Sequence, residues 1–398
     1  RSQFVTTTWT WTPNSTWVND LRFGWTFHHR EVVTADSVTP ISTSISTGVT
    51  NPLLVGFPTI TVTNFTNIGG DQNLPKNYGP SKAYDIVDHV SYLRGKHAFK
   101  FGGEMLFARP FFGNFSGGRG VIAFTGKAAF ATSTALEDFL AGTPDNSTSP
   151  TSLILNGDVR RHLRQENYSA FFEDTWHVQR TVTLNLGLRY EYFTPLADSQ
   201  NLIGGWDPVV GLQQVGVNVN SAYKGYRKDF SPRLGVAWDI GGKGKTVLRA
   251  GGGIYYSSPV LGSLVDNIGL PGKPGGLTAI PTAYSTGADG TAAPLKAISS
   301  GGIGAAAVSF AGSVLNWSVA GPIFPPSQIG PTSGFRCGDG LSGHPSTCSV
   351  LVTGPTYRPP RVEIWSVGIQ RTLTNNFTLE VNYVGDHSGD LIGIQDVN

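Results

Sequence analysis

The segment that most constrains the fold is 168–195, YSAFFEDTWHVQRTVTLNLGLRYEYFTP, which predicts two strands joined by a tight polar turn at 177–180. After the joint, apolar side chains occupy every second position and alternate with polar or charged ones. A period of two is that of a β-strand with one apolar face. The apolar set is Leu184, Leu186, Leu188 and Tyr190. The opposite set is Thr183, Asn185, Gly187, Arg189 and Glu191.

The strand before the joint follows the same rule with one interruption. Tyr168, Ala170 and Phe172 share a face and Trp176 ends it, whereas Asp174 breaks it close to the strand end, where a charge is easier to hold. Strands of about ten residues with one apolar face, one polar face and aromatic ends are the unit of a transmembrane β-barrel.

The same pattern recurs along the chain and predicts five hairpins. Each carries an apolar row opposite a polar row, and each has a turn of a few residues. The predicted hairpins span about 3–29, 81–109, 168–195, 229–257 and 365–383.

The connections between hairpins are long and irregular, unlike the turns within them. Connections of two to six residues are usual in compact domains, but here they cover about 30–80, 110–160, 194–229 and 258–360. A soluble β-sandwich or propeller has no reason to sort its loops by length in this way. The sequence therefore predicts an all-β fold, one antiparallel up-and-down transmembrane β-barrel domain, partial at about ten strands, with short periplasmic turns and very long extracellular loops.

Two local signals predict structure inside these loops. Residues 58–62 have the character of a short strand. Thr134 and Glu137 match a capping box at the start of a short helix that Gly142 and Pro144 stop.

Composition narrows the class further. Only 14% of residues are charged and the net charge is +2, so no nucleic-acid partner is indicated. No apolar run is long enough for a transmembrane helix, and no signal peptide is visible, as expected for a mature protein or an internal fragment. Cys337 and Cys348 lie in a Gly/Ser/Pro-rich stretch without neighbouring zinc ligands, which favours a disulfide over two free thiols.

Several segments resemble the barrel strands of TonB-dependent outer-membrane receptors, in particular the Oar-like branch with very large outer loops. They are 168–176 (YSAFFEDTW), 183–191 (TLNLGLRYE), 230–238 (FSPRLGVAW), 97–104 (HAFKFGGE) and the loop segment 136–142 (LEDFLAG). The resemblance touches nearly every hairpin. It implies a 22-stranded barrel in the cell outer membrane, closed by an N-terminal plug and driven by the TonB complex.

The sequence departs from that family pattern in three ways. It has no plug-like region or TonB box, too few strands, and no terminal aromatic residue, since it stops at Asn398. Energy coupling through TonB would therefore depend on a plug that these residues do not contain. The resemblance does not indicate which solute is carried.

Polar residues of the predicted inner face are the first set of site candidates. They would line a hydrated lumen and contact a plug or a solute, or they would simply form the solvated and mutually paired interior that a wide barrel needs. The candidates are Arg22, Lys100, Glu104, Asn185, Arg189, Glu191, Arg249, Glu380 and Asn382.

Aromatic residues form two further sets. The strand aromatics fit girdles at the two membrane interfaces better than ligand-stacking positions; they are Trp9, Trp11, Trp17, Trp176, Tyr190, Tyr192, Trp238, Tyr255, Tyr256 and Tyr383. Ligand contact is better placed in the long loops, where the candidates are Trp206, Tyr223, Tyr226, Trp317 and Phe335.

No catalytic, cofactor or metal motif survives inspection. Gly244-Lys245-Thr246 echoes a phosphate-binding loop, but position 239 is Asp where the leading Gly belongs. His28 and His29 point to opposite faces of a strand and cannot easily share a metal ion. We therefore expect no enzyme activity, no cofactor and no metal.

The leading hypothesis is an outer-membrane receptor and transporter that captures an unknown large solute on its outer loops and admits it through the lumen. The alternatives are a surface barrel that displays adhesive loops without transport, and a soluble, secreted β-rich binding module. The face assignment predicts that Leu186→Arg impairs membrane assembly far more than Asn185→Arg.

Overall fold

The structure of the chain is a computed structural model. It describes residues 1–33, 35, 54, 56–71, 74–114, 118–144, 153–156, 160–199, 204–207, 211–214, 220–221, 223–258, 282–286, 292–294, 304–307, 336–337 and 357–391.

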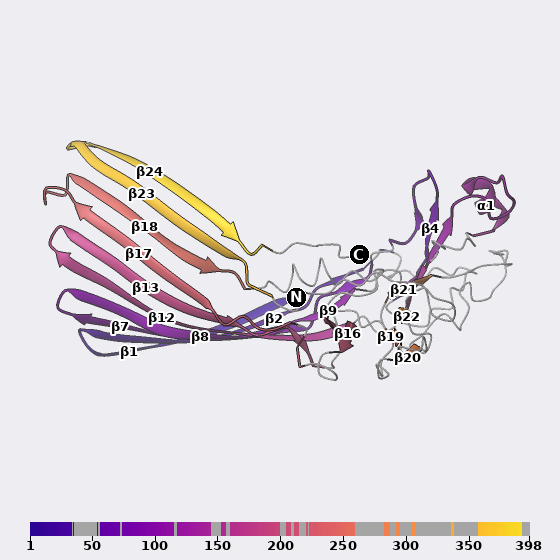
Figure 1. The fold of residues 1–398 in the computed structure, drawn as a ribbon, viewed down its shortest axis with the longest axis horizontal. Coiled ribbons are helices and arrows are strands. Elements are labelled where there is room, and N and C mark those ends of the chain that lie inside the picture. Colours follow the sequence, from indigo (N-terminus) through magenta and orange to yellow (C-terminus); the bar gives the residue numbers. More distant parts are fainter. Residues whose placement is uncertain are drawn as a thin grey trace.

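Ten long antiparallel strands form one large sheet, and each is hydrogen-bonded to the next long strand in the chain (Figure 1). This up-and-down order confirms the predicted hairpins. The strands are β1 (Ser2–Asn14), β2 (Trp17–His28), β7 (Ser81–Arg94), β8 (His97–Arg109), β12 (Arg160–Gln179), β13 (Val182–Phe193), β17 (Asp229–Asp239), β18 (Thr246–Tyr256), β23 (Arg361–Thr374) and β24 (Phe377–Gly389).

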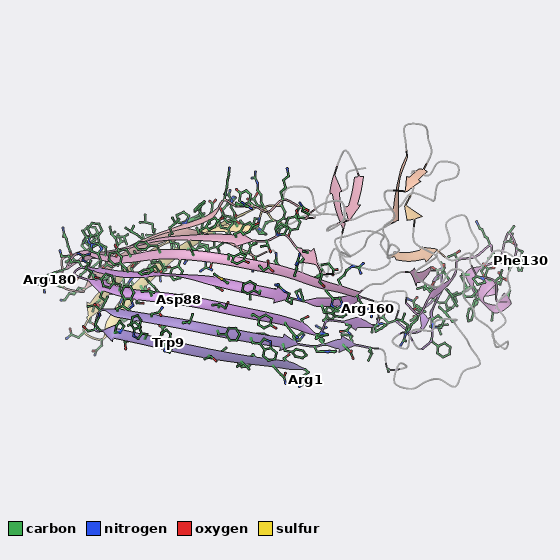
Figure 2. The ribbon with its side chains drawn as sticks, turned by 90° about the horizontal axis from the view of Figure 1, so that it is seen from below. Arg1, Trp9, Asp88, Phe130, Arg160 and Arg180 are labelled. Carbon is green, nitrogen blue, oxygen red and sulfur yellow. The ribbon has the colours of Figure 1, made fainter. Side chains whose placement is uncertain are left out.

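The sheet has two unlike ends. Tight turns join the strands at one end, the short-turn end, where Arg180 lies (Figure 2). All long connections leave from the opposite, long-loop end, as Figure 1 shows. The sheet is open rather than closed, because β1 pairs only with β2 and β24 only with β23 in the described part of the chain.

One strand is longer than predicted. β12 begins at Arg160 rather than near Tyr168, because its first residues find partners contributed by two long loops. Arg160 to His162 pair with β9 (Phe111–Asn114), and Leu163 and Arg164 pair with β14 (Ala197–Asp198).

The long loops contain the remaining strands. Other short strands at the long-loop end are β3 (Glu31–Val32), β5 (Ile68–Gly69), β6 (Lys76–Asn77), β11 (Leu153–Asn156), β15 (Gly204–Asp207), β16 (Gly211–Gln214), β19 (Thr282–Thr286), β20 (Ala292–Pro294), β21 (Gly304–Ala307) and β22 (Arg336–Cys337).

A small packed unit, the loop subdomain, forms far from the large sheet (Figure 1). Its centre is a parallel pair made by β4 (Thr59–Val62), which confirms the strand predicted at 58–62, and β10 (Val121–Phe124). Every residue of β10 is buried, so this unit has the apolar core that the large sheet lacks on either face.

The predicted helix is α1 (Ala135–Ala141). Thr134 accepts a hydrogen bond from the Glu137 backbone N–H and the Glu137 side chain accepts one from the Thr134 backbone, which confirms the capping box. Gly142 ends the helix with φ 70°, a left-handed conformation that favours glycine. Phe139 packs edge-on against Phe124 of β10 at 5.3 Å between ring centroids.

No helix in the described part of the chain has the length and apolar character needed to cross a membrane.

Candidate functional site

The large sheet has one apolar and one polar face, and the register between strands shows this directly. Leu186 of β13 lies opposite Leu234 of β17, and Leu184 lies opposite Val236. Leu186, Leu234 and, on β24, Leu379 are 39%, 61% and 49% exposed. The apolar side chains therefore cover an outer surface and do not fill a dry centre.

Every predicted inner-face residue lies on the opposite face, the polar face. Cross-strand partners share a face, and the row Glu104, Ser169, Glu191, Asp229 runs across β8, β12, β13 and β17. The structure thus brings together, on one face, Arg22, Lys100, Glu104, Asn185, Arg189, Glu191, Arg249, Glu380 and Asn382.

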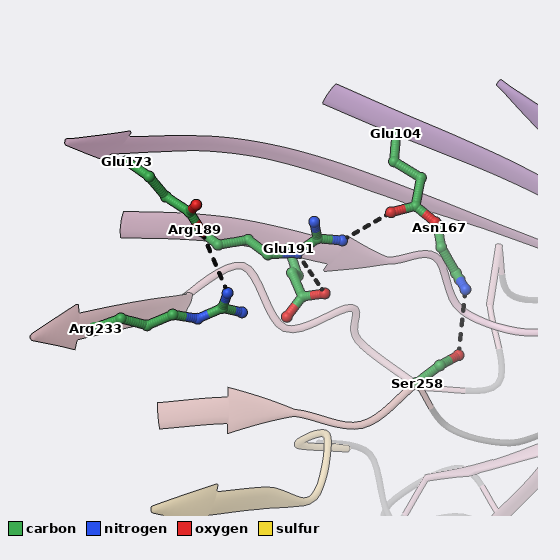
Figure 3. Close-up of polar contacts among 7 residues, drawn as sticks. All are labelled: Glu104, Asn167, Glu173, Arg189, Glu191, Arg233 and Ser258. Carbon is green, nitrogen blue, oxygen red and sulfur yellow. Dashed lines mark hydrogen bonds and ion pairs between the residues drawn. The ribbon is translucent and has the colours of Figure 1, made fainter. Parts of the chain in front are cut away.

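Arg189 is the centre of the polar face (Figure 3). Its Nη2 donates to Glu104 Oε2 on β8 at 3.0 Å, and its Nε donates to Glu191 Oε1 on its own strand at 3.1 Å. The guanidinium reaches across β12 to join two strands that are not neighbours. Charged hydrogen bonds of this kind are the stronger ones in proteins, so this triad links β8 to β13 across β12.

A second ion pair lies closer to the short-turn end. Arg233 Nη1 is 3.5 Å from Glu173 Oε1, and the Arg233 guanidinium also lies over the Tyr255 ring at 4.8 Å from its centroid. Tyr255 is therefore on the polar face, and its assignment to an interface girdle was wrong. The period of two along β18 already placed Tyr255 on the same side as Arg249, Gly251 and Gly253, and the register confirms it.

A cavity of about 420 Å³ opens on this face beside the second ion pair. Glu173, Asn185, Arg233 and Tyr255 are among its walls. Its floor includes Gly187, Gly235 and Gly251, so bare backbone forms the base. The cavity offers a carboxylate, a guanidinium, an amide and an aromatic ring to a polar solute.

Three other predicted inner-face residues are hydrogen-bonded at the β23–β24 side of the sheet. Arg249 Nη1 donates to Gln370 Oε1 at 2.8 Å, and Asn382 Nδ2 donates to Glu380 Oε1 at 2.9 Å. Arg22 and Lys100 lie on the polar face of β2 and β8.

The prediction did not single out Glu173 and Arg233, although the signal was present. Both follow the period of two that selected Asn185 and Arg189. Asp174, the interruption of the apolar face, also has a partner that the sequence did not reveal. His97 Nδ1 lies 2.7 Å from Asp174 Oδ2, so these two polar side chains pair with each other on the apolar face.

The loop candidates are scattered. Tyr223 is only 4% exposed, its hydroxyl accepts a hydrogen bond from Leu196 N at 3.1 Å, and burial raises its pKa to about 12. Its ring packs at a tilt of 48° against the ring of Tyr357, so this side chain is part of the packing and does not face a solute. Tyr226 lies under the Arg358 guanidinium at 5.7 Å, and Trp206 lies in β15. Trp317, Phe335 and Cys348 fall outside the described residues, and so does the predicted disulfide.

No three His, Cys, Asp or Glu side chains converge to hold a metal ion within the ranges that the structure describes.

Comparisons with known proteins identify the family. The family model described as "Outer membrane beta barrel domain" matches residues 1–398. No curated protein matches the chain.

Solved structures that resemble the chain include the ferric enterobactin receptor PfeA from Pseudomonas aeruginosa, with 10% identity and a TM-score of 0.42 over 97% of this chain and 34% of the receptor. The siderophore receptors PirA and PiuA from Acinetobacter baumannii give 10% and 11% identity and TM-scores of 0.41 and 0.38, over 98% and 96% of this chain and 34% and 39% of theirs. The chain thus spans about a third of the length of these structures. At such identities and TM-scores the likeness does not specify a function.

Proposed function

Because the chain belongs to the outer membrane beta barrel domain family, we propose that it forms part of the wall of a receptor barrel that binds a large solute on its long loops and admits it through the lumen. The family places the protein in the outer membrane.

The observation that carries the proposal is the separation of the two faces. One face exposes rows of Leu, Val, Phe and Trp side chains, whereas the other holds the Arg189 triad and the Arg233 ion pair. An Arg or Lys at mid-bilayer costs about 2–4 kcal/mol on the lipid face. The apolar face therefore faces hydrocarbon in this proposal, and the polar face lines a hydrated lumen.

The aromatic side chains fit this orientation. On the apolar face of β7, Tyr84 and Tyr92 lie near the two ends of the strand. Tyr92 and Phe101 both pack against Trp17, with ring centroids 5.4 Å and 6.2 Å from that of Trp17. Aromatic girdles of this kind mark the two membrane interfaces of a barrel.

The long-loop end receives the solute in this proposal. Long loops are the extracellular side of outer-membrane barrels and short turns the periplasmic side. The cavity beside Arg233 and Glu173 lies on the route from the loops along the polar face. Dependence on the TonB complex rests on the resemblance of the strand motifs and would require a plug outside these residues.

Uptake by intact cells tests the proposal. Cells that carry the full-length protein and cells that lack it are supplied singly with a labelled siderophore, oligosaccharide or peptide too large for general porins. We expect the deletion to abolish uptake of one of these, and collapse of the proton-motive force to have the same effect. Arg189→Gln should slow that uptake several-fold, whereas Arg94→Gln, at the exposed turn of β7, should not.

The alternative is a barrel that displays an adhesive loop unit. The observation that favours it is the loop subdomain, in which α1 leaves Leu140 75% exposed and the loop before it leaves Phe130 57% exposed at the tip of the molecule (Figure 2). If the deletion lowers adhesion to host cells or surfaces while every uptake rate is unchanged, the transport proposal is wrong.

A further inference from the structure

Asp229 is a buried carboxylate without a partner. It is the first residue of β17, lies on the polar face at the long-loop end, and is fully buried. Neither of its carboxylate oxygens accepts a hydrogen bond. A buried ionised carboxylate is strongly unfavourable unless it is paired and hydrogen-bonded. The folded protein must therefore provide a partner that compensates the burial of this carboxyl group.

The negative charges around Asp229 make its ionised form still less favourable. Glu191 lies directly opposite on β13, and like charges at directly opposed positions destabilise a sheet. Asp390, after β24, adds a further negative charge to its surroundings. Arg189, two residues from Glu191, spends its hydrogen bonds on Glu104 and Glu191. Glu191 is thus paired with Arg189, and Asp390 lies 3.5 Å from Arg361 Nε, but the Asp229 side chain itself has neither an ion pair nor a hydrogen bond within the described structure.

Three further oxygens on the polar face at the long-loop end are buried without a partner among the described residues. Ser231 is fully buried and its Oγ has no partner. Ser169 Oγ and Asn167 Oδ1 are likewise buried without a partner on the same face of β12. Asn167 uses its Nδ2 to donate to Ser258 Oγ at 3.3 Å, which leaves its carbonyl oxygen available (Figure 3). A serine hydroxyl and an amide carbonyl can each present an oxygen lone pair to a cation.

We propose that this place at the long-loop end of the polar face is a calcium-type cation site held by Asp229 and Glu191, with neutral oxygens such as Ser231 Oγ and water completing the shell. Oxygen ligands select a hard cation over zinc or copper. Ca²⁺ accepts six to eight oxygens, including bidentate carboxylates and amide carbonyls, in flexible geometry, whereas Mg²⁺ demands a near-ideal octahedron. Full burial of Asp229 favours a small ion over the bulkier ammonium group of a solute.

The site goes beyond the proposed receptor function and does not depend on it. It uses only two carboxylates, from β13 and β17, which is why no group of three acidic or histidine ligands marks it among the described residues. The sequence gives no motif because its ligands lie on separate strands. An ion here would join β13 and β17 at the edge from which the loops emerge.

Calcium binding to the purified full-length protein tests the site. The protein is stripped with a chelator in detergent and titrated with CaCl₂, MgCl₂ or NaCl, with heat of binding and thermal unfolding as readouts. We expect Ca²⁺ alone to bind and to raise the unfolding temperature. Asp229→Asn should weaken Ca²⁺ binding at least tenfold. The matched control is Asp239→Asn, the same charge change at the short-turn end of the same strand, which should bind as the wild type does.

Two further readouts keep the test decisive. Without calcium, Asp229→Asn should unfold at a higher temperature than the stripped wild type, because an unpaired buried charge is removed. Ser231→Ala should weaken Ca²⁺ binding several-fold while leaving the stripped protein unchanged. The site is overturned if the wild type shows no calcium response, if Asp229→Asn binds calcium as tightly, or if Mg²⁺ acts equally.

Discussion

Two charged side chains of the large sheet, Arg189 and Asp174, are held by partners from distant parts of the sequence. The period of two along β13 places Arg189 and Glu191 on one face. The structure shows that Arg189 also binds Glu104 on β8. The same period marks Asp174 as an exception on the apolar face, and in the structure His97 is its partner. Such partners come from distant parts of the sequence, so only the register between strands reveals them.

Asp138 gives a prediction at this scale, because it is buried at the centre of the loop subdomain. It accepts hydrogen bonds from Ala128 N at 3.0 Å, Ala129 N at 2.9 Å and Ser133 Oγ at 2.5 Å. Asp138→Ala leaves these donors unpaired and should destabilise the subdomain by about 3 kcal/mol. Hydrogen exchange of peptides that cover residues 124–141 measures this loss of stability. Leu140→Ala, at an exposed position, should change stability by less than about 0.5 kcal/mol.

The same carboxylate predicts a pH dependence. Burial alone would raise the pKa of Asp138, but the hydrogen bonds from Ser133, Ala129 and Ala128 outweigh it and hold the pKa below its ordinary value. A carboxyl whose pKa is lowered by folding stabilises the folded state above its unfolded pKa of about 3.9, and this stability is lost as pH falls through the lower folded pKa. Exchange protection at 128–129 should therefore hold above about pH 4 and fall below it. Protection that is already lost between pH 6 and 5 would contradict this assignment.

At the scale of elements, local signals were sufficient where an element is made by neighbouring residues. The period of two gave the hairpins, the capping box gave α1, and a short apolar run gave β4. The early start of β12 and the parallel pairing of β4 with β10 were not predictable in this way. Each depends on a partner from another loop, 33 to 51 residues away for the start of β12 and 62 residues away for β4.

Adjacent residues of β13 test the face assignment. Leu186→Arg places a charge on the apolar face and should reduce the folded fraction in the outer membrane, at a cost of about 2–4 kcal/mol if it lies near mid-bilayer. Asn185→Arg adds the same charge to the polar face beside the cavity and should fold almost as well. Heat-modifiable mobility on gels separates folded from unfolded protein. Equal losses for the two variants would show that the faces are misassigned.

Glycines in the sheet provide a second test at this scale. A Cβ on Gly102 of β8 would fall against the carbonyl oxygen of Asp88 on β7, so the backbones must separate. At Gly235 of β17 the nearest atom to an added Cβ is 3.5 Å away, an ordinary contact. Gly102→Ala should therefore reduce the folded fraction strongly, whereas Gly235→Ala should not. The prediction fails if both alanine variants assemble like the wild type in the same gel assay.

For the whole molecule, the sorting of connections by length was the feature from which most of the architecture could be predicted. Short turns at one end and long loops at the other gave the architecture before any contact was known. The loop subdomain was not predictable as a unit, because its strands come from separate loops and its core forms only when they meet. The strand pattern does not indicate which solute is carried, because any wide barrel needs polar side chains on its inner face.

The free edges of the sheet lead to the last prediction. β1 and β24 each have one unpaired side in the described structure, and a membrane does not tolerate unsatisfied backbone groups. β1 starts and β24 ends at the long-loop end, so antiparallel closure needs an even number of further strands. Residues 1–398 expressed alone should therefore associate through these edges in detergent, as light scattering after size exclusion would show. Thr8→Lys on β1 should reduce association, whereas Ser366→Lys on β23, paired on both sides, should not. A stable monomer of this chain would mean that its edges are satisfied in another way.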